Sequence, residues 1–216
     1  MEQVHIIYFF DPLCLTCFSF RNVLSALMVK YRDYHFDILA GGMVTGNRTG
    51  PLSQKSDYLL KKVEAIENTT DTRFGDAYKA LVAEGTVISN SEPPSIAFNV
   101  FKSFRPDLRF HLAYSLQDLH FGLGMDPNLM KSYFNICEEF GINKFGFMDR
   151  FQDPAYKQLT WTLFKHAEAW GIKHFPTLMA ESDERRLVIQ QGYDSLEVLE
   201  RAFLQTLENL GNEPGK

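Results

Sequence analysis

Residues 5–17 read HIIYFFDPLCLTC and join a β-rich run to a cysteine pair at the start of a helix. The run over residues 4–10 predicts a short strand, which ends at Asp11-Pro12. Because a helix N-terminus offers free N–H groups and a positive dipole end, it stabilises a thiolate at Cys14, and Cys17 lies one turn further on. The helix is predicted over residues 14–31 from apolar residues at helical spacing, namely Phe20, Leu24, Leu27, Met28 and Tyr31.

A second strand is predicted over residues 35–39, ended by Gly41 and Gly42. The order strand, helix, strand predicts a parallel pair joined by a right-handed crossover. The following region, 46–167, has helical spacing. Asp-Pro pairs are typical helix starts and glycines typical stops. The predicted helices cover residues 55–67, 74–83, 95–104 and 107–121, a segment begun by Asp126-Pro127 and ended by Gly141, and one begun by Asp153-Pro154 and ended by Gly171.

Strand character returns near the C-terminal end. Residues 177–180 and 187–191 flank a polar turn over 181–185 and predict an antiparallel hairpin. The segment Asp194-Ser195-Leu196-Glu197 resembles a capping box that opens a last helix to about residue 210. The elements add up to βαβ, a helical insertion and ββα, which predicts an α/β protein with a four-stranded mixed sheet.

A second part of the site is expected at His174-Phe175-Pro176-Thr177, directly before the hairpin. A proline there begins a strand in the simplest interpretation. Together with Cys14 and Cys17, however, its place in the element order resembles that of the cis-proline that faces the cysteine pair in thioredoxin-type folds, and this resemblance favours a cis X–Pro bond here. The sequence therefore brings two distant segments to one candidate site for thiol–disulfide exchange.

The motif Asp11-Pro12-Leu13-Cys14-x-x-Cys17, a long helical insertion, and Gly171-Ile172-x-x-Phe175-Pro176-Thr177-Leu178 together resemble the DsbA-like oxidoreductases, with the cytosolic FrnE-like branch the most similar. The segments Ser91-Glu92-Pro93-Pro94-Ser95 and Gly192-Tyr193 also match that group. The resemblance implies a thioredoxin-like domain over residues 1–45 and 168–216, with a helical domain inserted at 46–167, and dithiol–disulfide exchange as the activity.

On this resemblance, Cys14 is the attacking thiol, Cys17 resolves the mixed disulfide, and Pro176 holds the substrate backbone. Phe18, Phe175 and Thr177 are expected to contact substrate, with the two phenylalanines lining an exposed apolar groove. Asp11 and His174 are possible assisting groups. Asp11 would raise the pKa of the Cys14 thiol if it stayed charged nearby, and as an alternative it caps the helix.

The dipeptide between the cysteines departs from the family pattern. Family members often carry Pro followed by His or Trp there, whereas this chain has Leu15-Thr16. A His would favour the neighbouring thiolate, so its absence removes one source of oxidising power. We therefore expect a reduction potential below that of strong oxidants.

Two other interpretations of the cysteine pair, a structural disulfide and a zinc site, have less support from the sequence. A structural bridge over so short a loop would stabilise the fold by only about 2 kcal/mol. A zinc site needs two further ligands, and the sequence has neither a second Cys-x-x-Cys nor a His-x3–5-His. Cys137 falls on an apolar helix face, as buried free cysteines usually do. We expect no metal and no cofactor.

Composition and charge limit the classes of partner that this protein is expected to bind. The 216 residues carry a net charge of −5, which is a poor basis for binding nucleic acid. No stretch approaches the roughly 20 apolar residues of a membrane helix, and the N-terminus has no signal-peptide pattern. These features predict a cytoplasmic protein whose partners are protein or low-molecular-weight thiols and disulfides, with a reductase or oxidant that recycles it.

Two alternative functions use the same fold. One is an adaptor that binds a partner protein through the helical insertion, in which case binding would survive substitution of Cys14 and Cys17. The other is a glutathione-dependent isomerase of the kappa-like type. Those enzymes usually carry Ser at the Cys14 position and do not need the second cysteine, so the pair argues against this alternative.

Overall fold

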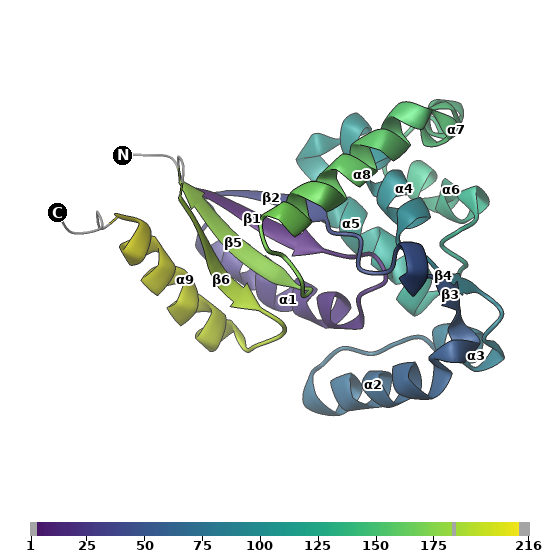
Figure 1. Ribbon diagram of the computed structural model, residues 1–216, viewed down its shortest axis with the longest axis horizontal. Coiled ribbons are helices and arrows are strands. Elements are labelled where there is room, and N and C mark those ends of the chain that lie inside the picture. The colour runs from purple at the N-terminus through teal and green to yellow at the C-terminus, as the bar shows by residue number, and fades with distance from the viewer. Residues whose placement is uncertain (1–3, 183–184, 212–216) are drawn as a thin grey trace.

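A four-stranded mixed sheet forms the centre of the protein, in a computed structural model that describes residues 4–182 and 185–211. The strand order is β2-β1-β5-β6 (Figure 1). β1 (His5–Phe10) and β2 (His35–Ala40) are parallel, and α1 (Leu15–Lys30) connects them. β5 (Thr177–Ser182) pairs antiparallel with β1, and β6 (Arg185–Gln191) with β5. The predicted mixed sheet is confirmed.

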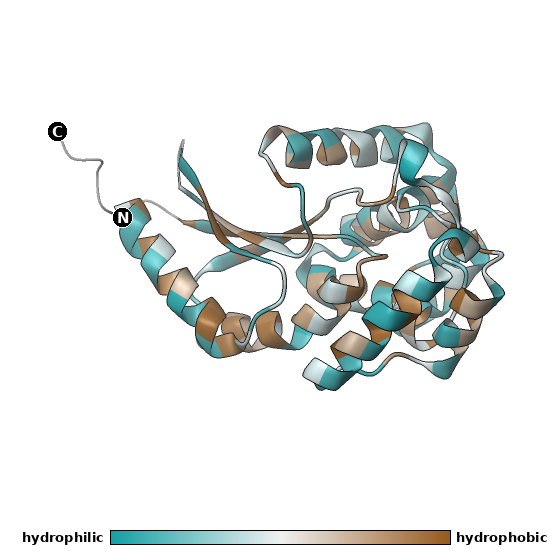
Figure 2. Cartoon of the chain, turned by 60° about the horizontal axis from the view of Figure 1, so that its bottom comes forward, coloured by the Kyte–Doolittle hydropathy of each residue, from teal (hydrophilic) through white to brown (hydrophobic). Residues whose placement is uncertain are grey.

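Alternation along β1 divides its side chains between two apolar clusters. Ile6, Tyr8 and Phe10 belong to the main core, together with residues of α1 and of α9 (Leu196–Gly211), which lies along β6 (Figure 1). Ile7 and Phe9 face the other side and pack with residues at and beyond the end of the eighth helix. Burial of both faces explains why β1 reads as a continuous apolar run. The helices combine hydrophilic and hydrophobic residues, as Figure 2 shows.

Seven further helices, α2 to α8, lie toward one end of the sheet (Figure 1). Phe10 and Phe98 have ring centroids 5.0 Å apart, so the main core continues from the sheet into these helices. The predicted boundaries of the insertion stay a prediction. The helices are α2 (Ser56–Thr69), α3 (Asp76–Glu84), α4 (Glu92–Phe104), α5 (Arg109–Gln117), α6 (Phe134–Glu139), α7 (Lys144–Gln152) and α8 (Pro154–Ala169).

Shorter elements link these helices. A two-residue antiparallel pair, β3 (Gly50–Pro51) with β4 (Ile88–Ser89), interrupts the helical character of the region. A π-helical turn, Asp118–Gly122, extends α5. Single 3-10 turns occupy Gly46–Arg48, Leu52–Gln54, Pro106–Leu108 and Met130–Tyr133. None of the helices within the described residues is long and apolar enough to cross a membrane.

The prediction that a helix begins at Asp126-Pro127 is wrong. The carboxylate of Asp126 accepts hydrogen bonds from the main-chain and side-chain N–H groups of Asn128, at 2.9 and 2.7 Å. The side chain of Asp126 therefore closes a turn, a competing use of Asp that local sequence pattern does not distinguish from helix capping. The α-helix in this segment is α6, which begins only at Phe134.

The other differences from the predicted elements concern one further helix and the turn of the hairpin. α7 was not predicted, although Asn143 caps it by accepting the N–H of Gly146 at 2.8 Å. The expected hairpin turn is shorter than 181–185, because Glu181, Ser182 and Arg185 belong to strands, and residues 183–184 lie outside the described residues. At α9, Ser195 accepts the N–H of Val198 at 3.4 Å.

Candidate active site

Cys14 is the N-cap residue of α1, so the predicted start of this helix is confirmed within one residue. The Cys14 sulfur accepts a hydrogen bond from the main-chain N–H of Cys17 at 3.1 Å, and the main-chain N–H of Cys14 donates to the carbonyl of Asp11 at 3.0 Å. Both cysteines are free thiols. Cys14 is 3% exposed and Cys17 is fully buried, so a reagent from solvent reaches Cys14 first.

The surroundings of Cys17 favour its protonated form. Burial raises the pKa of the Cys17 thiol well above its ordinary value, and the contact with Cys14 raises it further. The phenol of Tyr8 is also buried, and its pKa is raised by burial and by the nearby sulfurs of Cys17 and Cys14. Sequence reasoning missed Tyr8. The period of two along β1 was the available signal, because it places Tyr8 on the face that packs against α1.

The segment before β5 faces the cysteines. The bond between Phe175 and Pro176 is cis, as expected from the sequence. The Cys14 thiol donates a hydrogen bond to the carbonyl oxygen of Phe175 at 3.4 Å. Thr177 is buried in the sheet, and its hydroxyl donates to the carbonyl of His174 at 2.7 Å. The side chain of His174 is exposed.

Asp11 lies beneath the site with no exposure to solvent. Its carboxylate accepts hydrogen bonds from Leu13 N–H at 2.9 Å, Met43 N–H at 2.6 Å and the Ser91 hydroxyl at 2.9 Å. Burial raises the pKa of Asp11 to about 6, against the lowering effect of these three donors. Asp11 thus joins the segment before Cys14 to the loop after β2 and to the start of α4.

Ser91 is the second residue that sequence reasoning did not assign. Besides donating to Asp11, its hydroxyl accepts the N–H of Val44 at 3.0 Å, and the residue is fully buried. The 80 positions between Asp11 and Ser91 leave no local signal for this contact.

Phe18 does not line an exposed groove, which corrects the expectation from the sequence. It is 3% exposed, and its ring lies 5.1 Å from the rings of both Phe74 and Phe121. The guanidinium of Arg21 lies 4.2 Å from its ring centroid. This face of α1 packs against the helical region instead, and Leu15, between the two cysteines, is buried in the same cluster.

Phe175 is half-buried, and its ring fills the space beside Gly41. A Cβ atom at Gly41 would lie 2.0 Å from that ring. Gly41 therefore lets the chain after β2 pass directly against the segment that holds the Cys14 contact.

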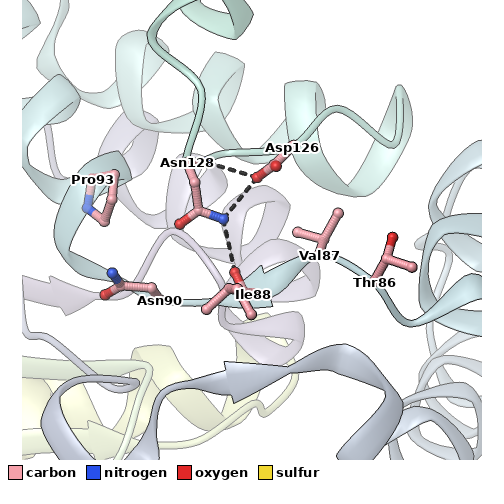
Figure 3. A pocket seen from close by; sticks show the side chains of 7 residues that line it. All are labelled: Thr86, Val87, Ile88, Asn90, Pro93, Asp126 and Asn128. Carbon is pink, nitrogen blue, oxygen red and sulfur yellow. Dashed lines mark hydrogen bonds between the residues drawn. The ribbon is translucent and has the colours of Figure 1, made fainter.

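A hollow of about 500 Å³ lies away from the cysteines. In it, the side-chain amide of Asn128 donates to the Ile88 carbonyl at 2.8 Å and to Asp126 at 2.7 Å (Figure 3). These polar groups satisfy one another. No group of three or more His, Cys, Asp or Glu side chains within residues 4–182 and 185–211 could hold a metal ion.

Several solved structures resemble this protein over nearly the whole length of the chain. A protein disulfide isomerase candidate from Nitrosomonas europaea is 25% identical, with a TM-score of 0.86 over 96% of this chain and 99% of that one. The cytosolic disulfide reductase DsbM from Pseudomonas aeruginosa is 24% identical, with a TM-score of 0.75 over 95% and 99%. A DsbA oxidoreductase candidate from Streptomyces coelicolor is 12% identical, with a TM-score of 0.73 over 99% and 93%.

No protein-family model matches the sequence, and no curated protein sequence matches it. The structural likeness, the mixed sheet and the cysteine pair at the N-terminus of α1 agree with one another. The chain therefore has a thioredoxin-type fold with a helical insertion, as the DsbA-like proteins that it resembles do.

Proposed function

We propose that this protein is a thiol–disulfide oxidoreductase that exchanges disulfides through Cys14 and Cys17. The observation that carries the proposal is the position of the Cys14 sulfur. It lies at the N-terminus of α1, 3.1 Å from the Cys17 N–H and 3.4 Å from the carbonyl of Phe175. The names of the similar proteins from N. europaea and P. aeruginosa support the same chemistry.

The burial of the two sulfurs sets their order of action. The Cys14 thiolate attacks a substrate disulfide, the substrate S–S bond breaks, one substrate thiolate leaves, and a mixed disulfide forms. Cys17 then attacks the Cys14 sulfur, which releases the second thiolate and closes the Cys14–Cys17 disulfide. Its raised pKa keeps Cys17 protonated until that step, so it must give up a proton as it attacks. An external thiol reductant restores the dithiol.

The neighbouring residues support this cycle in different ways. In our proposal Phe175 and Pro176 present their backbone to the bound substrate, and Thr177 holds this segment through its bond to His174. Asp11 fixes the loop before Cys14 and lies close enough to Cys17 for its charge to affect that thiol. The exposed His174 is a candidate for proton exchange with solvent.

We further propose that the cycle runs toward disulfide reduction, on low-molecular-weight disulfides, in the cytoplasm. Leu15 between the cysteines is buried among apolar side chains and provides no charge to favour the thiolate. The 3% exposure of Cys14 favours a small substrate over a folded protein. The reductase from P. aeruginosa is named cytosolic, and it has also been solved with GSH at 20% identity and a TM-score of 0.72.

The test is an equilibrium redox titration against glutathione, read by thiol alkylation and mass. We expect a reversible two-electron transition that is lost in Cys14→Ser, with a midpoint nearer to about −270 mV than to about −120 mV. A midpoint near the upper value would contradict reduction alone. Absence of any reversible transition would contradict the oxidoreductase itself and favour an adaptor.

A further inference from the structure

A hollow of about 330 Å³ adjoins the cysteine site. It lies between the loop after β2, the C-terminal half of α8 and the segment before β5. Its volume falls within the range of small-molecule pockets, about 300–1,000 Å³. Phe175 is part of its lining, and the carbonyl of the same residue contacts the Cys14 thiol at 3.4 Å. A ligand in this hollow is therefore one residue away from the reacting sulfur.

Glycine backbone and aromatic rings form one wall of the hollow. A Cβ atom at Gly42 would lie 2.7 Å from the ring of Phe164, and one at Gly41 would lie 2.0 Å from the ring of Phe175. Gly42 also has a positive φ of 70°, which favours glycine. This close packing of backbone on rings makes the wall preformed.

Cationic side chains surround the opening. Arg48, Lys165 and Lys173 line the hollow, and Glu168 is the one carboxylate among its lining residues. The Arg48 guanidinium donates to the carbonyl of Gly42 at 3.2 Å and to the Thr45 hydroxyl at 3.3 Å, which holds it at the rim. Lys165 and Lys173 have no ion pair with a carboxylate in the part of the chain that the structure describes.

We propose that this hollow binds the carboxylate groups of an anionic low-molecular-weight disulfide while one of its sulfur atoms reacts with Cys14. The inference rests on the proposed function and adds the charge of its substrate. The positive rim attracts carboxylates, the aromatic wall covers the apolar part of the ligand, and Phe175 links the hollow to Cys14. The enzyme dithiol supplies two electrons, both substrate sulfurs leave as thiols, and a thiol reductant returns the enzyme to its starting state.

The experiment measures how fast the reduced full-length protein is oxidised by three disulfides of different charge. They are glutathione disulfide, which is anionic, bis(2-hydroxyethyl) disulfide, which is neutral, and cystamine, which is cationic. Each rate constant is divided by that of the uncatalysed exchange of the same disulfide with a free thiol. For the wild type we expect this ratio to be highest with the anionic disulfide and lowest with the cationic one. Added salt should weaken this preference because it screens exposed charges.

The variant Lys165→Glu/Lys173→Glu should lower the preference for glutathione disulfide over the neutral reagent by about tenfold, since two attractive charges become repulsive. The matched control is Lys61→Glu/Lys131→Glu, which makes the same change of net charge at exposed lysines outside the hollow. Its preference should stay close to that of the wild type. The rate with the neutral reagent reports whether each variant keeps an intact cysteine site.

The outcomes separate the two proposals. A preference that does not change in Lys165→Glu/Lys173→Glu, or that falls equally in the control, overturns the anion site and leaves the oxidoreductase standing. Equal relative rates of the wild type with all three reagents do the same. If the reduced wild type reacts with none of the three faster than the uncatalysed exchange, the oxidoreductase fails and the anion site fails with it.

Discussion

The thiol of Cys14 lies 3.4 Å from the carbonyl oxygen of Phe175, a residue 161 positions further along the chain. The ring of the same Phe175 packs so closely against Gly41 that no side chain fits between them. The end of β2, the segment before β5 and the start of α1 are thereby in contact at one point. The position of the reacting sulfur depends on all three.

Gly41→Ala tests this dependence. The new methyl group would overlap the Phe175 ring, with 2.0 Å between Cβ and Cε1, so the ring and the carbonyl beside it must move. Displacements near 1 Å at a reacting centre can lower rates by on the order of 100-fold. We expect slower reduction of a neutral disulfide, measured under single-turnover conditions. Gly122→Ala is the control, because nothing lies within 4 Å of a Cβ there, and an equal loss in both variants would contradict the argument.

The different burial of the two cysteines predicts different phenotypes for their serine variants. Cys14→Ser should abolish disulfide exchange, whereas Cys17→Ser should accumulate a mixed disulfide at Cys14 that mass spectrometry detects. Cys137→Ala should keep the wild-type rate. Cys137 is 2% exposed, and burial raises the pKa of its thiol to about 11, so it forms little thiolate. A mixed disulfide at Cys137, or the absence of any mixed disulfide in Cys17→Ser, would contradict this assignment of roles.

Local sequence pattern was enough to predict the cysteine cap of α1 and the end of α8. Both depend on neighbours within one helical turn, as the Cys17 N–H bond to Cys14 and the left-handed φ of 76° at Gly171 show. Asp126 satisfied the same local rules and was nevertheless misassigned. Its carboxylate accepts hydrogen bonds from the main-chain and side-chain N–H groups of Asn128 instead. Helix capping and this turn are both local uses of Asp, so the local pattern does not distinguish them.

Contacts between distant segments account for what was missed at the site. Phe18 was assigned to an exposed groove because its helix neighbours the cysteines, but Phe74 and Phe121 cover its ring. The contact of Asp11 with Ser91 spans the first strand and the fourth helix. Neither pairing leaves a periodicity in the sequence, so only the assembled fold reveals it.

Ser91→Ala should destabilise the protein. The substitution removes the hydroxyl that donates to Asp11 at 2.9 Å and leaves the N–H of Val44 without its 3.0 Å acceptor. Buried polar groups that lose a partner cost about 1–3 kcal/mol each. We expect a lower midpoint in urea unfolding with an unchanged slope. The exposed Ser53→Ala is the control, and equal midpoints for the two variants would count against a structural role for the Ser91 hydroxyl.

The Asp11 carboxyl gives the stability of the protein a pH dependence of a particular sign. Its pKa is about 6 in the folded protein, where burial outweighs three hydrogen bonds, and about 4 in an unfolded chain. Between these values the folded state holds the proton more tightly than the unfolded state. Raising the pH from about 4 to about 6 therefore removes stability, by roughly 3 kcal/mol from this group, and the loss is complete above pH 6.

Asp11→Asn isolates that contribution. Asparagine cannot accept all three hydrogen bonds, so the variant should be less stable at low pH, but its side chain does not titrate. Lowered pKa values at Asp37 and Glu67 give the opposite slope in both proteins and cancel in the comparison. Urea unfolding at pH 4, 5, 6 and 7 should show the stability deficit of Asp11→Asn shrinking by about 2–3 kcal/mol as the pH rises. A deficit that stays constant over this range would mean that Asp11 titrates alike in the folded and unfolded chains.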